Sequence, residues 1–204
     1  MYIPSKFQVT DLEEVHRFIE RYGFGIILSD SLEGTHLPFI LEKNEGEFGT
    51  LYCHFARANP HWQILAEKMT LVVFHGPHAY ISPTWYQGKP NVPTWNYTAV
   101  HVYGRLSVLA EADVVGVMEK TVKKYEPEVW SDQAVMPEEY REKLQKAIVA
   151  CKITLTKVEA QYKLGQHRKT EDQQGVTDAL SRLSDIDSIA LYGFMQQQQI
   201  GLGK

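Results

Sequence analysis

Apolar residues recur at helical spacing close to the start of the chain. They are Leu12, Val15, Phe18, Ile19 and Tyr22. Thr10 and Glu13 lie at the start of this run with the S/T-x-x-E spacing of a capping box. In this motif each of the two side chains accepts from a backbone N–H that has no partner within the helix. Gly23 is placed to end the helix. The pattern therefore predicts a helix over residues 11–22.

Alternating and continuous apolar runs then predict strands. In the longest one, Val100, Val102 and Leu106 share one face and polar residues share the other. Pro38 interrupts one run, which is typical of an edge or bulged strand, and Gly76-Pro77 breaks another. The strands expected from these runs cover residues 24–29, 35–41, 49–55, 69–75, 78–82, 96–109 and 148–159.

Helical patterns return later in the chain. They cover residues 111–125, 137–147 and, after Thr170, about 171–196, followed by a polar tail over 196–204 that we expect to fray. Six or seven strands in pairs and meanders, with few helices between them, favour an antiparallel barrel. The expected organisation is a barrel domain over residues 1–170 and a C-terminal helical annex over 171–204.

Composition narrows the class of protein. The 204 residues are 44% hydrophobic and 23% charged, which is ordinary for a globular domain. No apolar run approaches the length of a membrane span, and the N-terminus lacks a signal-peptide core, so we expect a cytoplasmic protein. Cys53 and Cys151 form no metal-binding spacing and are predicted to be free, buried thiols.

Charge argues against a nucleic-acid footprint that covers the whole protein. With 21 basic and 25 acidic residues the net charge is −4. A late basic stretch from Lys152 to Lys169 is a solvated strand face and turn, or a source of one or two phosphate contacts with Lys163 and Gln166 as candidates, or, as a third option, a DNA-binding helix. The C-terminal helices carry more acidic than basic residues and would repel DNA.

Prolines and tryptophans are concentrated between Asn59 and Asn96. Five of the nine prolines and three of the four tryptophans lie there. Loops stiffened by proline and carrying aromatic rings make rigid walls for a flat ligand. The alternative is that these residues only close the ends of the barrel.

Arg57 is the fixed cation of the polar segment 53–62, and its guanidinium could grip a phosphate. The alternative is an ion pair with a carboxylate. His75 and His78 have the spacing of a metal-ligand pair, but the intervening Gly-Pro prevents a helical face and no third ligand is indicated, so no metal is expected. Glycine-rich phosphate loops and nucleophile motifs are missing, and no catalytic residue can be assigned.

At these residues the sequence resembles the PaiB family, bacterial FMN-binding proteins described as negative transcriptional regulators. The resemblance runs almost end to end, in order, through Met1–Pro4, Gly34–Pro38, His54–Pro60, Phe74–Pro83 and Val92–Tyr97. One motif departs from the family pattern. The late Lys-Leu-Ser-Gln-Asn of the family reads Lys163-Leu164-Gly165-Gln166-His167 here, so ligand contacts at positions 165 and 167 are in doubt.

The resemblance implies a fold, an oligomeric state and a biological role. The fold would be mainly β with flanking helices, an FMN-binding split β-barrel of the pyridoxamine-phosphate-oxidase-like kind. Such proteins are homodimers with FMN at the subunit interface. The implied role is repression of sporulation and of degradative (protease) enzyme production. The alternative is an FMN-dependent oxidoreductase whose regulatory effect is indirect, and a DNA-binding repressor that uses FMN as a sensor is a third hypothesis.

We expect the flavin contacts from three groups of residues. Arg57 would bind the phosphate, with Lys163 as a second cation and Asn59 as a donor. The edge of the isoalloxazine would be lined by Thr35, His36, Leu37 and Pro38. The site would be closed by Trp85, Trp95 and Asn96, which either the same subunit or the partner subunit would supply. The remaining expected contacts are His54, Ala56, Ser82 and Gln166.

Overall fold

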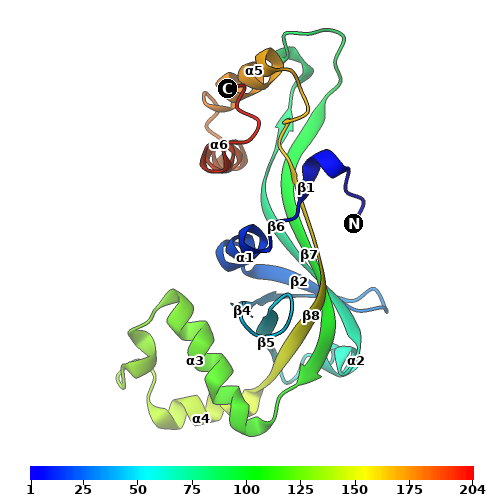
Figure 1. The fold of residues 1–204 in the computed structure, drawn as a ribbon. Helices are drawn as coiled ribbons and strands as arrows, with labels where there is room; N and C mark the ends of the chain where they lie inside the picture. Colours follow the sequence, from blue (N-terminus) through cyan, green and yellow to red (C-terminus); the bar gives the residue numbers. More distant parts are fainter. The chain divides into compact units, whose positions relative to one another are not determined.

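The computed structural model describes all 204 residues, and its strands join in one sheet (Figure 1). The strand order is β3-β2-β6-β7-β8-β5-β4, with β1 paired to β8. The strands are β1 (Gln8–Val9), β2 (Phe24–Leu28), β3 (Gly34–Pro38), β4 (Ile40–Glu42), β5 (Thr50–Ala56), β6 (Met69–Ile81), β7 (Thr94–Val108) and β8 (Ile148–Lys163).

Six α-helices accompany the sheet. They are α1 (Leu12–Arg21), α2 (His61–Leu65), α3 (Val114–Tyr125), α4 (Glu138–Ala147), α5 (Thr170–Leu180) and α6 (Ile186–Gln198). The predicted helices over 11–22, 111–125 and 137–147 are confirmed, whereas the short α2 was not predicted. None of the helices is both long and apolar enough to cross a bilayer.

The chain divides into two compact units, each built from separate stretches of sequence. The central unit contains Leu12–Phe74 and His101–Val158, and the terminal unit contains Met1–Asp11, His75–Val100 and Glu159–Lys204. The C-terminal helices thus pack with the segment 75–100. The boundary expected at residue 170 stays a prediction.

In the central unit, β5 lies between β4 and β8 and pairs antiparallel with both. The run 148–159 alternates as predicted, since Val149, Cys151, Ile153 and Leu155 of β8 are buried, and Leu51 and Phe55 of β5 are fully buried as well. Burying a large aliphatic or aromatic side chain contributes about 1.5–3 kcal/mol. The core residues of this face therefore fix the register, because a slip of one residue would turn them to the other face.

Pro38 divides the predicted strand 35–41 into two. β3 pairs with β2, and β4 pairs with β5, so the two pieces lie at opposite ends of the strand order. The intervening Phe39 is fully buried and its N–H donates to the carbonyl of Gly23 at 2.7 Å. Since proline has no N–H for a ladder, an edge is where a sheet tolerates it. The predicted edge position is confirmed.

The predicted break at Gly76-Pro77 is wrong. β6 runs without interruption from Met69 to Ile81. The Pro77 carbonyl accepts a hydrogen bond from the Thr98 hydroxyl at 3.2 Å, so a polar group of this segment is satisfied inside the fold. The buried Phe74 and Ile81 on either side hold the strand in place.

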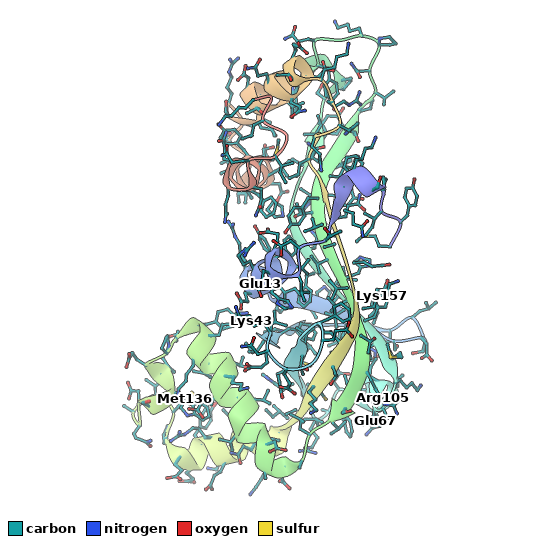
Figure 2. All side chains as sticks on the ribbon, in the orientation of Figure 1. Glu13, Lys43, Glu67, Arg105, Met136 and Lys157 are labelled. Atoms are coloured by element: carbon teal, nitrogen blue, oxygen red, sulfur yellow. The ribbon has the colours of Figure 1, made fainter.

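Helices α3 and α4 of the central unit enclose a small apolar cluster with the segment that joins them. Met136, labelled in Figure 2, is buried there with Val117, Met118 and Trp130. Arg141 of α4 lies over the Trp130 ring at 5.1 Å. This cluster explains why α3 and α4 form although α4 itself has no buried residue.

In the terminal unit, α5 and α6 pack beside each other (Figure 1). The Tyr162 ring of β8 meets the Phe194 ring of α6 edge-on, with 5.0 Å between ring centroids. The expectation that the tail after 196 frays is wrong. Leu202 is buried, and the Gly203 N–H donates to the Gln173 side chain at 3.2 Å. The polar composition of the tail predicted fraying, but a single buried leucine between two glycines is enough to anchor it.

Candidate functional site

Thr35 and Asn59, both predicted flavin contacts, come together in the central unit. Asn59 Nδ2 lies 3.4 Å from Thr35 Oγ1, and His61 Nδ1 lies 2.7 Å from the same oxygen. The backbone N–H of His61 donates to Asn59 Oδ1 at 2.9 Å. β3 supplies Thr35, the loop before α2 supplies Asn59, and α2 begins with His61. Two of the sequence motifs thus meet in one hydrogen-bonded network.

His61 is a residue of this network that the sequence analysis did not single out. Its side chain is fully buried, and Nε2 has no hydrogen-bond partner. Burial lowers the pKa of His61, against an opposing effect of Glu33. The imidazole is therefore neutral at physiological pH. Its place in the polar segment 53–62 was the only sequence signal for it.

The predicted residues of β3 divide between its two faces, with Leu37 on the face of Thr35 and His36 and Pro38 on the other. Side chains alternate along a strand, so His36 points to the opposite face from Thr35. His36 is exposed and stacks on Phe24 at 6.1 Å, whereas Leu37 is buried in the core. A ligand that contacts the Thr35 side chain would meet position 36 only through its backbone.

Arg57 holds the junction between α4 and β8. Its Nε donates to the carbonyl of Lys146 at 2.7 Å, and its Nη2 donates to the carbonyl of Ile148 at 2.8 Å. Both acceptors are backbone carbonyls, whereas the alternative interpretation expected a carboxylate. Both N–H groups of Nη1 and one of Nη2 are not used in these bonds, and the phosphate role of Arg57 stays a prediction.

His54 and Ala56 lie near the end of β5, just before Arg57. They face Ala150 and Ile148 across the ladder with β8. Nδ1 of His54 is buried without a partner, and burial lowers the pKa of this histidine. Ala56 is exposed. The two side chains lie on one face of β5, so one ligand could reach both.

A second set of predicted residues lies in the terminal unit. Lys163 Nζ donates to Thr94 Oγ1 at 2.7 Å and to the carbonyl of Trp95 at 2.8 Å. Burial lowers the pKa of Lys163, and the nearby Arg168 lowers it further. Two of its three N–H groups hold the start of β7, and Nζ also lies over the Tyr97 ring, 5.9 Å from its centroid.

Gln166 is occupied by the backbone around it. Its Oε1 accepts from the N–H of Leu164 at 2.8 Å, while Nε2 donates to the carbonyls of Tyr162 and Lys6. The amide thus locks the turn that follows β8. A direct ligand contact would have to replace one of these bonds.

The remaining predicted residues lie on and before β7. The Ser82 hydroxyl caps the turn 83–85, accepting from Thr84 N–H at 3.2 Å, and Trp85 in that turn is half-buried. Trp95 is exposed and contacts His78 and Tyr80, whereas Asn96 is buried. These residues carry the exposed aromatic surface of the terminal unit.

The substituted motif has a local explanation. Gly165 has a φ of +83°, a conformation that suits glycine, so a serine there would be strained unless the turn changed. The ring of His167 packs edge-on against Phe7, with 5.2 Å between centroids. Burial lowers the pKa of His167, and the cations Lys6, Arg168 and Lys163 lower it further. Cationic side chains therefore gather at this motif.

His75 and His78 lie against each other in the terminal unit. Their ring centroids are 4.6 Å apart and the rings meet edge to face. The structure gathers no group of three or more histidine, cysteine, aspartate or glutamate side chains that could hold a metal ion.

The donor set of each unit suits part of FMN. The phosphate needs a cation, for which the prediction names Arg57 in the central unit and Lys163 in the terminal unit. The isoalloxazine presents ring nitrogens and carbonyls, which need donors such as the Thr35 hydroxyl and the Asn59 amide. FMN supplies reversible one- and two-electron transfer when bound.

Comparisons with known proteins agree with this chemistry. Residues 1–157 match the family model described as "Putative FMN-binding domain". The "Protease synthase and sporulation protein PAI 2" of Bacillus subtilis (strain 168) is 38% identical over 189 residues, which cover 88% of this chain and 89% of that protein.

Two solved structures share the fold. The flavocytochrome Anf3 from Azotobacter vinelandii has a TM-score of 0.57 at 13% identity, covering 79% of this chain and 72% of its own. The FAD and heme binding protein from Mycobacterium smegmatis has a TM-score of 0.55 at 14% identity, covering 78% and 74%. At these identities the likeness concerns the fold, and it confirms a mainly β split barrel with flanking helices.

The resemblance found in the sequence motifs is therefore confirmed over most of the chain. The protein belongs to the PaiB family, which is built on this FMN-binding domain, and its cofactor is FMN.

Proposed function

We propose that the protein is an FMN-dependent regulator of protease production and sporulation that works as a homodimer. The observation that carries the regulatory role is the 38% identity to the Bacillus subtilis protease synthase and sporulation protein over most of both chains. The observation that carries the flavin site is the network joining Thr35, Asn59 and His61.

The first experiment measures FMN binding and the contribution of Arg57 to it. Purified protein should show a flavin absorption spectrum or acquire one from added FMN, at about one FMN per subunit. If Arg57 binds the phosphate, Arg57→Ala should weaken FMN binding by about tenfold or more while leaving riboflavin binding unchanged, because a charge-assisted hydrogen bond contributes about 1.5–3 kcal/mol. Equal losses for both ligands would show that Arg57 acts only by holding the α4–β8 junction.

Arg105→Ala is the matched control. Arg105 is an exposed arginine of the same unit, and its guanidinium pairs with Glu67 at 3.1 Å (Figure 2). This variant removes a surface cation without touching any predicted flavin contact. It should bind FMN as the unaltered protein does. A protein that binds neither FMN nor riboflavin would overturn the flavin site.

The homodimer is supported by the exposed aromatic surface of the terminal unit. Trp95 is 52% exposed and Tyr80 is 46% exposed, and these two rings contact each other. Exposed aromatic side chains are enriched where proteins associate. Light scattering should give a dimer mass, and Trp95→Ser with Tyr80→Ser should shift it towards the monomer. A monomer in the unaltered protein would refute this part.

The regulatory role is tested in Bacillus subtilis lacking its own relative. Expression of this chain should restore normal protease secretion and sporulation frequency. Gel shifts at low and high salt test whether the effect is direct, because specific DNA binding weakens as salt rises. NADH consumption faster than free FMN allows, without any regulatory effect, would instead indicate a flavin-dependent oxidoreductase.

A further inference from the structure

The orientation of the Asn59 amide follows from its neighbours. The backbone N–H of His61 is a fixed donor, and it points at Asn59 from 2.9 Å. The atom that receives it must be the amide oxygen, so the amide nitrogen faces Thr35. Asn59 therefore donates a hydrogen bond to the Thr35 hydroxyl oxygen, over 3.4 Å.

The tautomer of His61 follows from the environment of its other nitrogen. The ring is neutral, so one of the two nitrogens carries the proton. Nε2 is buried without a partner, and at 6.2 Å between ring centroids Phe55 is too distant to accept an N–H in its place. A buried N–H without an acceptor is rarer in proteins than an acceptor without a donor. The proton therefore belongs on Nδ1, which lies 2.7 Å from Thr35 Oγ1.

The Thr35 hydroxyl then has a defined role. Its oxygen receives two hydrogen bonds, from Asn59 and from His61, so its own proton must point to a third group. Thr35 is half-buried, so part of its surface is open to solvent. We propose that His61 is a positioning residue that makes the Thr35 hydroxyl a hydrogen-bond donor, so that this part of the site selects a ligand through an acceptor atom.

This inference rests on the proposed flavin site for the identity of the ligand. The carbonyl oxygens and unprotonated ring nitrogens of oxidised isoalloxazine are acceptors of the required kind. Two-electron reduction converts one of these nitrogens into an N–H donor. A hydroxyl fixed as a donor therefore binds the oxidised ring at least as well as the reduced one.

The first test needs no flavin. In protein labelled with ¹⁵N-histidine, two-bond proton–nitrogen correlation spectra distinguish the two tautomers, and the resonances lost in His61→Asn identify those of His61. We expect Nδ1 to be protonated. Protonation of Nε2, or rapid exchange between the tautomers, would overturn the inference whether or not the protein binds FMN.

The second test uses variants that distinguish the loss of a hydrogen-bond donor from a change in side-chain size. His61→Asn places an amide N–H near the position of Nδ1–H, so it should retain FMN affinity. His61→Leu and Thr35→Val should each lose about tenfold, as expected for one hydrogen bond, and Thr35→Ser should lose little. Thermal melts of each variant establish that it is folded.

A double variant decides whether His61 acts through Thr35. Once Thr35→Val has removed the hydroxyl, adding His61→Leu should cause no further loss of FMN affinity. A full additional tenfold loss would show that His61 acts independently and would overturn the positioning role. Failure of the unaltered protein to bind FMN would refute the proposed flavin site, and the tautomer measurement would still stand.

Discussion

Cys53 lies directly opposite Cys151 across the antiparallel pair of β5 and β8. The two residues occupy a hydrogen-bonded position of the ladder. In an antiparallel ladder, hydrogen-bonded pairs recur every second residue. The N–H of Arg57 donates to the carbonyl of Ala147 directly opposite, and the N–H of Leu155 donates to that of Gly49. Cys53 lies four residues from both Arg57 and Gly49, so its pair with Cys151 is of the same kind. Both thiols are free and buried in the core. The strand register thus brings together two cysteines that are distant in sequence.

These thiols should react slowly while the protein is folded. Burial raises the pKa of Cys53 well above its ordinary value and that of Cys151 to about 12. Since the thiolate is the reactive form, Ellman's reagent should label neither residue readily at pH 8 and should label both at once in guanidinium. Cys53→Ala should leave one thiol in the unfolded protein. Rapid labelling of the native protein would contradict the burial of the pair.

Substitution of two helical glycines should have opposite effects on stability. A Cβ at Gly175 of α5 would lie 2.0 Å from the carbonyl oxygen of Trp85. Gly175→Ala should therefore force the loop away from the helix and cost about 2 kcal/mol, as overpacked substitutions do. Urea unfolding curves measure the change.

Gly193→Ala in α6 is the matched control for Gly175→Ala. A Cβ there meets nothing within 4 Å, and alanine favours a helix over glycine by about 1 kcal/mol. This variant should be as stable as the unaltered protein or more so. Equal destabilisation by both substitutions would show that the close approach at Trp85 is unimportant.

Acid should destabilise the fold through buried histidines. Burial lowers the pKa of His54 and of His61 in the folded protein, whereas the unfolded chain titrates at about 6.5. Below that value the unfolded chain binds more protons, so the free energy of unfolding should fall as pH decreases, by about 1.4 kcal/mol per pH unit for each histidine at most. Thermal melts between pH 7.5 and 5.5 should show it.

His54→Gln should make this pH dependence shallower. His36→Gln, which changes an exposed histidine, should leave it as it is. A melting temperature that stays constant from pH 7.5 to 5.5 would contradict the prediction.

Removal of the C-terminal tail should destabilise the terminal unit. Leu202 is buried, and Gly201 and Gly203 hold left-handed φ values of +73° and +72° that place it there. Leu202→Ala should cost about 2–3 kcal/mol, as the loss of buried leucine atoms does. Deletion of the exposed Lys204 alone should have no effect. Similar unfolding curves for Leu202→Ala and the unaltered protein would show that the tail is unimportant.

Much of the local structure could be predicted because its signals are local. The apolar spacing that predicted a helix over 11–22 and the alternation along 96–109 depend on neighbours within a few residues, and both elements formed. The interruption at Pro38 was likewise visible, because proline lacks a ladder donor wherever it stands. The family motifs pointed to the fold and to FMN for a different reason, since they preserve the residues themselves.

Tertiary packing decided what these local signals could not. Gly76-Pro77 has the composition of a break but continues a strand, because buried neighbours and the Thr98 hydroxyl hold it there. Strand register, which depends on the whole sheet, placed Cys53 opposite Cys151.

The candidate site shows the same division. The family motifs indicated Thr35 and Asn59 as flavin contacts, but only the folded chain brought them to His61 and left one imidazole nitrogen without a partner. The sequence thus determined which residues were available for the chemistry. The tertiary structure decided which of them touch, because contacts between distant segments follow from packing and register rather than from any local pattern.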